Sequence, residues 1–126
     1  MPVLCDADAR DLMETARGLE DLVTRARTGT FTPAEARGST FTISNHGVGG
    51  SRIATPIIIN QPQSAILGVG KLEQQPVVAD RSGTPQLAIQ PRCYVSLTLH
   101  HRVMDAQEGN RFVSAFVRQL TDWPHR

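Results

Sequence analysis

The sequence has little of several features that would narrow its function class. Among 126 residues there are two cysteines, and Cys5 and Cys93 lie too far apart to match a zinc or redox spacing. We therefore expect both to be reduced thiols in an intracellular protein without a structural metal. Thirteen basic residues nearly balance 12 acidic ones, and Lys71 is the only lysine. This balance leaves no long-range field that would attract nucleic acid or anionic lipid.

Long hydrophobic runs are also lacking. Stretches such as Ile57 to Ile59 are far shorter than the roughly 20 residues that a membrane helix needs. The N-terminus has no basic region followed by an apolar stretch, and no internal repeat is visible. We therefore expect a compact soluble chain with no membrane partner, no nucleic-acid partner and no export signal.

Apolar residues at helical spacing predict an amphipathic helix near the N-terminus. They run from Leu12 to Ala26, with Asp6 and Asp8 available as caps and Gly29 as the stop. Thr32 to Glu35 then predicts a single capped helical turn. The polar face of the helix, which we interpret as solvated, carries Glu14, Arg17, Asp21, Thr24 and Arg25.

From Ser39 onward the pattern becomes β-type. A glycine-rich loop, residues 45–51, follows the first predicted strand, and we interpret its glycines as permitting tight backbone geometry. A hairpin is predicted to pair residues 77–79 with residues 87–89. The other predicted strands are Thr40 to Ser44, Ile53 to Ile59, Ala65 to Val69 and Arg92 to Leu99.

A closing helix is predicted to begin near Asp105, which with Glu108 forms a capping-box pattern. Pro124 follows its end. Its predicted buried stripe consists of Phe112, Val113, Phe116, Val117 and Leu120. The order of helix, several strands and helix predicts an α+β fold, with helices packed against one mixed β-sheet.

The segment from His100 to Asp105 carries the most chemistry. In a strand that continued to His101 the two histidines would face opposite sides, which disfavours a shared metal site. His101 ends an apolar row, where partial burial would favour the neutral imidazole that a general base needs. From spacing alone, a structural histidine is still the favoured interpretation. Asp105 has a strong structural explanation as a helix N-cap, and that role is compatible with orienting the nearby strand end.

Other nucleophile and phosphate sites have weak support. Ser44 lies where a strand meets the glycine-rich loop, but it lacks the flanking glycines of a nucleophile elbow. The loop also lacks the Lys-Ser/Thr pair of a phosphate-binding loop. His46 in this loop and His125 near the C-terminus are expected to be exposed, and nothing supports Cys93 as a nucleophile.

Three ordered segments, taken together, resemble the acyltransferase component of 2-oxoacid dehydrogenase complexes. They are residues 41–45, 54–68 and 100–105, and the resemblance extends from about Pro2 to Trp123. The middle segment favours the succinyl-transferring branch. The resemblance implies a chloramphenicol acetyltransferase-like fold, assembled as trimers that build a larger hollow core, with active sites between subunits.

The resemblance also implies a role for each site residue. His101 matches the catalytic histidine, which acts as general base on the thiol of dihydrolipoamide or coenzyme A. Ser44 matches the hydroxyl that hydrogen-bonds the oxyanion of the tetrahedral intermediate, and it faces a histidine of a neighbouring subunit. Asp105 matches a polar residue that holds the local geometry. Coenzyme A and lipoamide are then substrates, no metal is needed, and the location is the cytoplasm, or the mitochondrial matrix in a eukaryote.

Two departures from the family pattern shape the expected domain organisation. Ala106 follows Asp105 where the family usually has glycine. Residues 1–8 resemble a segment from the middle of the catalytic domain, so residues 1–126 are expected to form a single partial domain, its C-terminal half. No lipoyl or peripheral-subunit-binding domain is recognised, and Lys71 does not fit a lipoylation context.

Such a partial domain should expose an apolar face or a sheet edge, to be covered by self-association or by another chain. The expected partners are a lipoyl domain, a missing N-terminal half and other components of the dehydrogenase complex. The alternative function is a catalytically silent assembly module.

Overall fold

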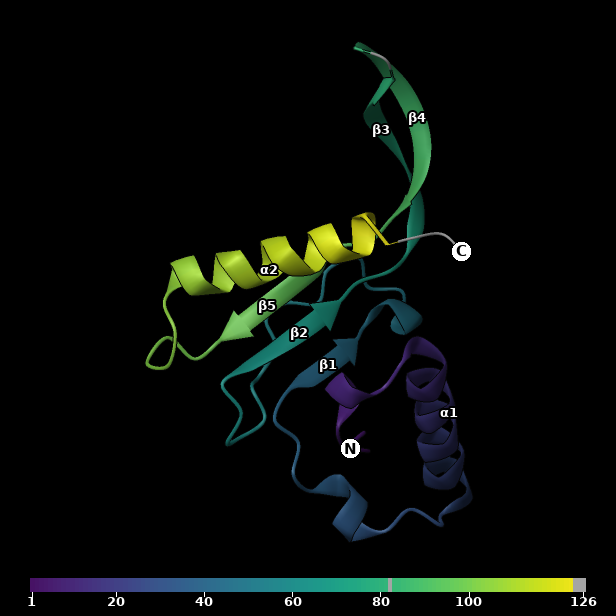
Figure 1. The fold of residues 1–126 in the computed structure, drawn as a ribbon, viewed down its shortest axis with the longest axis vertical. Helices are drawn as coiled ribbons and strands as arrows, with labels where there is room; N and C mark the ends of the chain where they lie inside the picture. Colours follow the sequence, from purple (N-terminus) through teal and green to yellow (C-terminus); the bar gives the residue numbers. More distant parts are fainter. Residues whose placement is uncertain (82, 124–126) are drawn as a thin grey trace. The chain divides into compact units, whose positions relative to one another are not determined.

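The computed structural model describes residues 1–81 and 83–123, and it divides into two compact units, Met1–Thr40 and Phe41–Arg126 (Figure 1). The first unit contains helix α1 (Leu12–Thr28) between two short 3-10 turns, η1 (Ala7–Ala9) and η2 (Pro33–Ala36). The second unit contains five strands, the 3-10 turn η3 (Gly47–Gly49) and helix α2 (Ala106–Thr121). No helix within the described ranges has the length and apolar character needed to cross a membrane.

Helix α1 begins at Asp11. The Asp11 side chain accepts a hydrogen bond from the Glu14 backbone N–H at 2.7 Å, and the Glu14 carboxylate accepts one from the Asp11 N–H at 3.0 Å. The prediction that Asp6 or Asp8 caps this helix is therefore wrong, because Asp11 satisfies the free N–H groups. The predicted stop is confirmed, since Gly29 ends the helix with φ 76°.

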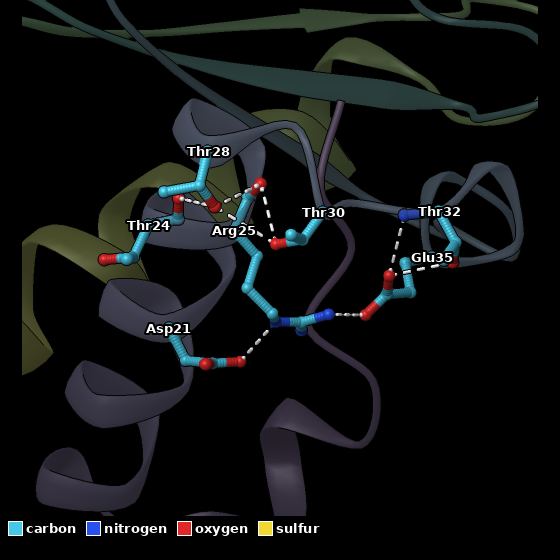
Figure 2. Close-up of polar contacts among 7 residues, drawn as sticks. All are labelled: Asp21, Thr24, Arg25, Thr28, Thr30, Thr32 and Glu35. Carbon is cyan, nitrogen blue, oxygen red and sulfur yellow. Dashed lines mark hydrogen bonds and ion pairs between the residues drawn. The ribbon is translucent and has the colours of Figure 1, made fainter.

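The polar face of α1 is solvated as predicted except at half-buried Arg25, which lies in an ion-pair network. Figure 2 shows the Arg25 guanidinium between two carboxylates, with Asp21 at 2.8 Å on one side and Glu35 on the other. Glu35 also accepts hydrogen bonds from the Thr32 backbone N–H at 2.9 Å and from its hydroxyl at 2.8 Å. The Thr32 backbone, Arg25 and the Thr32 hydroxyl together lower the pKa of Glu35 to about 2. The network ties η2 to the last turns of α1.

The second unit is built on a mixed three-stranded sheet. Its order is β1 (Thr42–Asn45), β2 (Ala65–Val69) and β5 (Val95–Leu99), with β1 parallel and β5 antiparallel to β2. Four of the five β2 residues are buried, and Leu67 is 1% exposed. Buried Thr42 donates from its hydroxyl to the Gln63 side-chain oxygen at 2.7 Å. The predicted β2 is confirmed, and the α+β class with a mixed sheet holds.

Residues 53–59, all of which the structure describes, form no strand, so that prediction is wrong. Pro56 has no N–H to give to a sheet ladder. The segment instead crosses β2 at Gly68, where an added Cβ would lie 2.5 Å from Ile57 Cδ1 and 2.7 Å from the Ala54 carbonyl oxygen. The Ser96 hydroxyl donates to that same carbonyl. The Ala54 carbonyl therefore accepts its hydrogen bond from a side chain of the sheet rather than from a paired strand.

The predicted hairpin is confirmed, and it is longer than expected. β3 (Glu73–Arg81) and β4 (Thr84–Arg92) form their own two-stranded antiparallel ribbon instead of joining the larger sheet. Val78 pairs with Leu87, and they are 75% and 78% exposed. Ile89, two residues after Leu87 on the same face, is exposed to a similar extent. The expected exposed apolar face is therefore present on this ribbon.

Helix α2 packs against β5, as seen in Figure 1. Gly109 makes the closest approach, since a Cβ there would lie 2.5 Å from Leu99 Cδ2. The Phe112 ring contacts a tilted Phe41 ring at a centroid distance of 5.8 Å and stacks on Phe116 at 6.5 Å.

The predicted buried stripe of α2 is only partly right. Val113 and Phe116 are half-buried, whereas Phe112, Val117 and Leu120 are exposed. The close approach of α2 to β5 lies at Gly109, in the first turn of the helix, and the stripe continues beyond this contact toward Leu120. Pro124, which was predicted to follow the end of this helix, lies outside the described residues.

Candidate functional site

Ser44 lies at the carboxyl end of β1, opposite Gly68 of β2. Its side chain is half-buried. β1 pairs in parallel with the buried central strand, so the position of Ser44 along the sheet is set by register rather than by a flexible loop. A single hydroxyl at this place can donate one hydrogen bond.

The glycine-rich loop after Ser44 is held tightly against the end of β2. The His46 N–H donates to the Val69 carbonyl at 2.9 Å, and the Lys71 N–H donates to the Ser51 carbonyl at 2.8 Å. A Cβ at Gly47 would lie 2.6 Å from the Gly70 carbonyl oxygen, so only glycine allows this approach. The interpretation that these glycines permit tight backbone geometry is confirmed.

His46 is brought into contact with Ser44. The His46 Nε2 and Ser44 Oγ atoms are 3.0 Å apart in a half-buried pair. The prediction that His46 is solvent-exposed is therefore wrong. The sequence carried a signal for this contact, because residues two apart along an extended chain share a face. His125, predicted to be exposed as well, lies outside the described residues.

His101 lies just beyond β5, in a turn. The strand ends at Leu99, the His100 N–H donates to the Ser64 carbonyl at 2.8 Å, and the His100 carbonyl accepts from the Val103 N–H at 2.8 Å. The His101 side chain is exposed, so the partial burial considered for it is wrong. It is His100 whose Nδ1 is buried, with no hydrogen-bond partner among the described residues. Both differences arise because the chain turns after Leu99 rather than continuing as a strand.

Asp105 is the N-cap of α2, as predicted. Its side chain accepts from the Glu108 backbone N–H at 2.8 Å, and the Glu108 carboxylate accepts from the Asp105 N–H at 3.0 Å. The Met104 N–H donates to the His100 carbonyl at 3.3 Å. The cap and this turn together fix the short connection that carries His101.

Ser44 and His101 are not brought together in one copy of the chain. Ser44 is level with Gly68, and Leu99 is level with Ala65. Because β2 runs from Ala65 to Val69, these two levels are about 10 Å apart along the strand direction. His101 lies further along still, because it follows the end of β5 at Leu99. β5 and β1 point in opposite directions (Figure 1).

Three charged side chains gather where β2 leads into β3. Arg52 forms an ion pair with Glu73, and Lys71 Nζ lies 4.0 Å from the same carboxylate. Burial acts to raise the pKa of Glu73, but the hydrogen bond from Gln75 and the ion pairs lower it overall. This cluster follows the loop that holds Ser44, and it leaves Lys71 and Arg52 with exposed positive groups. Cys93 is an exposed free thiol just before β5.

Comparison with known proteins places this geometry in a family. The family model for the catalytic domain of 2-oxoacid dehydrogenase acyltransferases matches residues 1–125. The acetyltransferase component of the pyruvate dehydrogenase complex of Mycobacterium bovis is 38% identical over 122 residues, covering 96% of this chain and 22% of the relative. The succinyltransferase component of the 2-oxoglutarate dehydrogenase complex of Rickettsia conorii is 40% identical over 126 residues, covering 100% of this chain and 30% of the relative.

Solved structures agree with the sequence matches. A probable dihydrolipoamide acetyltransferase of Listeria monocytogenes superposes with a TM-score of 0.82 at 32% identity, covering 90% of this chain and 47% of that one. The dihydrolipoamide acetyltransferase of Azotobacter vinelandii gives 0.79 at 34% identity, covering 96% and 48%. That enzyme was investigated for the role of a serine, a histidine and an asparagine in its catalytic mechanism. The cubic core of a pyruvate dehydrogenase multienzyme complex gives 0.79 at 33% identity, covering 96% and 48%.

The chain spans about half the length of these solved structures and less than a third of these curated relatives. Within that span, sequence and fold point the same way. Because the family model covers residues 1–125 and the solved relatives share the fold at more than 30% identity, the chain belongs to the 2-oxoacid dehydrogenase acyltransferase family, in the part that corresponds to its catalytic domain.

Proposed function

We propose that this chain transfers an acyl group between the thiols of dihydrolipoamide and coenzyme A, at a site formed between two copies. The observation that carries the proposal is the placement of His101 and Ser44 at opposite ends of one sheet in a chain of this family. Acyl transfer needs a base for the thiol and a donor for the oxyanion within reach of one carbonyl. Two copies meeting end to end would supply one from each.

The chemistry assigned to His101 is general-base catalysis. Its imidazole takes the proton from the attacking thiol, and the thiolate attacks the thioester carbonyl to form a tetrahedral intermediate. The intermediate then collapses and expels the other thiolate, which recovers the proton from the imidazolium. Exposure of His101 in a single copy supports this role, because its ring is free to face a substrate and a second copy.

Ser44 is assigned as the oxyanion donor. Its hydroxyl is fixed by the β1–β2 register and would donate to the carbonyl oxygen as negative charge develops there. Such a donor is effective when it is held in place before the reaction. The loop after Ser44 is hydrogen-bonded to the end of β2, which supports this role.

Asp105 is assigned to positioning. Its carboxylate caps α2 and thereby holds the turn from His100 to Met104. The relative from Azotobacter vinelandii supports the assignment, because the histidine and asparagine studied there are four residues apart, as are His101 and Asp105 here. Asparagine and aspartate cap helices about equally well, so the substitution preserves the cap.

The proposal extends to the acyl group, the partners and the domain limits. The sequence resemblance favours succinyl transfer, and the relatives include both acetyl- and succinyltransferase components. We propose a lipoyl domain on another polypeptide segment as the acyl carrier, and a region equivalent to the other half of the catalytic domain as a packing partner. The exposed apolar face of β3 and β4 is available for self-association into a core.

The test measures transfer from succinyl-CoA and acetyl-CoA to dihydrolipoamide by the assembled protein and by a His101→Ala variant. The exchange is expected to lower kcat by about 10²- to 10⁴-fold. The stability of the fold should not change, because the side chain is exposed. Undiminished transfer in His101→Ala would remove the assignment.

The second candidate is a catalytically silent assembly module. It is favoured by the coverage of only about half of each solved core. Titration with coenzyme A separates the two functions. Specific binding coupled to thiol-dependent turnover excludes the silent module, and its absence in the assembled protein excludes the enzyme.

A further inference from the structure

We propose that His46 is a positioning residue for acyl transfer, which donates from Nε2 to Ser44 Oγ and so leaves the serine proton free for the oxyanion. The proposal rests on the proposed function of Ser44. The contact between the two side chains is 3.0 Å and half-buried. His46 lies outside the three segments that carry the family resemblance. The proposed role belongs to its imidazole side chain.

The backbone of His46 is anchored by hydrogen bonds. Its N–H donates to the Val69 carbonyl at the end of β2, at 2.9 Å. Its carbonyl accepts from the Gly49 N–H at 3.1 Å and from the Ser51 N–H at 3.3 Å. Both backbone groups of His46 are thus engaged, and the residue is anchored to the same central strand that sets the position of Ser44. A histidine anchored in this way can restrict the rotation of the neighbouring hydroxyl.

Its close packing adds to this restraint. The next residue, Gly47, contacts the Gly70 backbone so closely that a Cβ would lie 2.6 Å from a carbonyl oxygen. The Asn45 side-chain oxygen accepts from the Gly47 N–H at 3.0 Å. The chain on both sides of His46 is therefore held closely, which keeps the residue beside Ser44, where its ring contacts the hydroxyl.

The direction of the hydrogen bond follows from what the serine must do. A hydroxyl has one proton to donate and two lone pairs to accept with. If Nε2 carried no proton, Ser44 would give its only proton to the ring and would have none for the oxyanion. If Nε2 carries the proton, Ser44 accepts from His46 through one lone pair and its own proton is free to point at the substrate. The function of Ser44 therefore requires the tautomer protonated at Nε2, or the imidazolium.

The first test is a double-mutant cycle in the assembled protein. Ser44→Ala is expected to lower kcat about 100-fold, in the range seen when an oxyanion donor is removed. We expect His46→Ala to lower kcat about tenfold with KM unchanged, and the double variant to be no slower than Ser44→Ala alone. His46→Gln, whose amide can still donate, should recover most of the loss. Losses that multiply in the double variant would mean that His46 does not act through Ser44, and they would overturn the proposal.

The second test does not depend on turnover. The ¹⁵N signals of the imidazole report which ring nitrogen carries a proton. We expect a protonated Nε2 in His46 whose signal shifts in Ser44→Ala. An unprotonated Nε2 at neutral pH would overturn the proposal whatever the activity. A protonated, Ser44-sensitive Nε2 in a protein with no acyl transfer would instead support the contact and count against the proposed function.

The remaining alternative is that His46 acts as a base and Ser44 as a nucleophile. That chemistry would transfer the acyl group to Ser44 Oγ, release the thiol, and increase the mass of the chain by one acyl group. Mass spectrometry after brief incubation with acyl-CoA detects such an ester. An adduct on Ser44 that is absent from Ser44→Ala would overturn the positioning role, and an unmodified Ser44 in turning-over protein supports it.

Discussion

Ser44 and His101 are held at opposite ends of the same three-stranded sheet by the register of β1, β2 and β5. Each residue is placed by a separate device: a parallel strand pair for Ser44, and the turn and helix cap after β5 for His101. No rotation of side chains can close the resulting gap within one copy. The active site proposed for this chain must therefore be shared between copies.

A shared site predicts complementation between inactive variants. Ser44→Ala and His101→Ala should each be nearly inactive alone. When they are unfolded and reassembled together, a random mixture should recover about a quarter of wild-type activity, because that fraction of contacts pairs an intact serine with an intact histidine. Activity is measured as acyl transfer from acyl-CoA to dihydrolipoamide.

The control for complementation is the same mixture made without unfolding, in which copies do not exchange. A reassembled mixture as inactive as its parents would contradict a shared site. It would mean instead that both residues act within the same copy.

The close approach of the glycine-rich loop predicts a sharp cost at Gly70. A Cβ there would lie 1.9 Å from the Arg52 carbonyl oxygen, so Gly70→Ala must displace main chain rather than the end of a side chain. We expect a loss of about 1–3 kcal/mol in the free energy of unfolding. Urea unfolding measures it.

Gly49→Ala is the matched control for Gly70→Ala. It lies in the same loop region, and nothing lies within 4 Å of its added Cβ. Its stability should stay within about 0.5 kcal/mol of the wild type. Equal costs at the two positions would contradict the packing described for this loop.

The cap at Asp105 predicts a difference between two substitutions. Asp105→Ala removes the acceptor for the Glu108 N–H and should lower stability by about 1 kcal/mol. Asp105→Asn keeps an acceptor there and should cost only a few tenths of a kcal/mol. Thermal unfolding compares them. If Asp105→Asn lost as much stability as Asp105→Ala, the negative charge rather than the cap would be the source.

The network at Glu35 predicts an acid-sensitive N-terminal unit. Its pKa is lowered from 4.5 to about 2, first by the Thr32 backbone and then by Arg25 and the Thr32 hydroxyl. Because the folded-state pKa is the lower one, the stabilisation is fully present above about pH 4.5 and is lost as the pH falls toward about 2. Glu35→Gln should be less stable than the wild type at neutral pH, and the difference should vanish near pH 2.

Urea unfolding at a series of pH values measures this effect for the wild type and for Glu35→Gln. Glu20→Gln, on the exposed surface of α1, removes the same charge and serves as the control. An NMR titration of Glu35 with a midpoint near 4.5 would contradict the network as drawn in Figure 2.

Local sequence signals predicted most of the elements but not their partners. The capping pair of Asp105 and Glu108 and the glycine stop at Gly29 appear where expected, because each depends on residues a few positions apart. Residues 53–59 look like a strand by composition, yet they cross the sheet at Gly68. Whether such a segment pairs as a strand or packs over a sheet depends on contacts with distant parts of the chain, and composition does not predict these contacts.

For the site, residue types and spacing were enough to select the candidates: Ser44 before a glycine-rich loop, and His101 followed by Asp105, in segments typical of the family. Their positions in space became clear only from the fold. Strand pairing separates Ser44 from His101, the turn after Leu99 exposes His101, and the anchored loop brings His46 to Ser44. Residue type and local spacing can be read directly from the sequence. Register and packing cannot, because they depend on contacts between segments that are far apart in the chain.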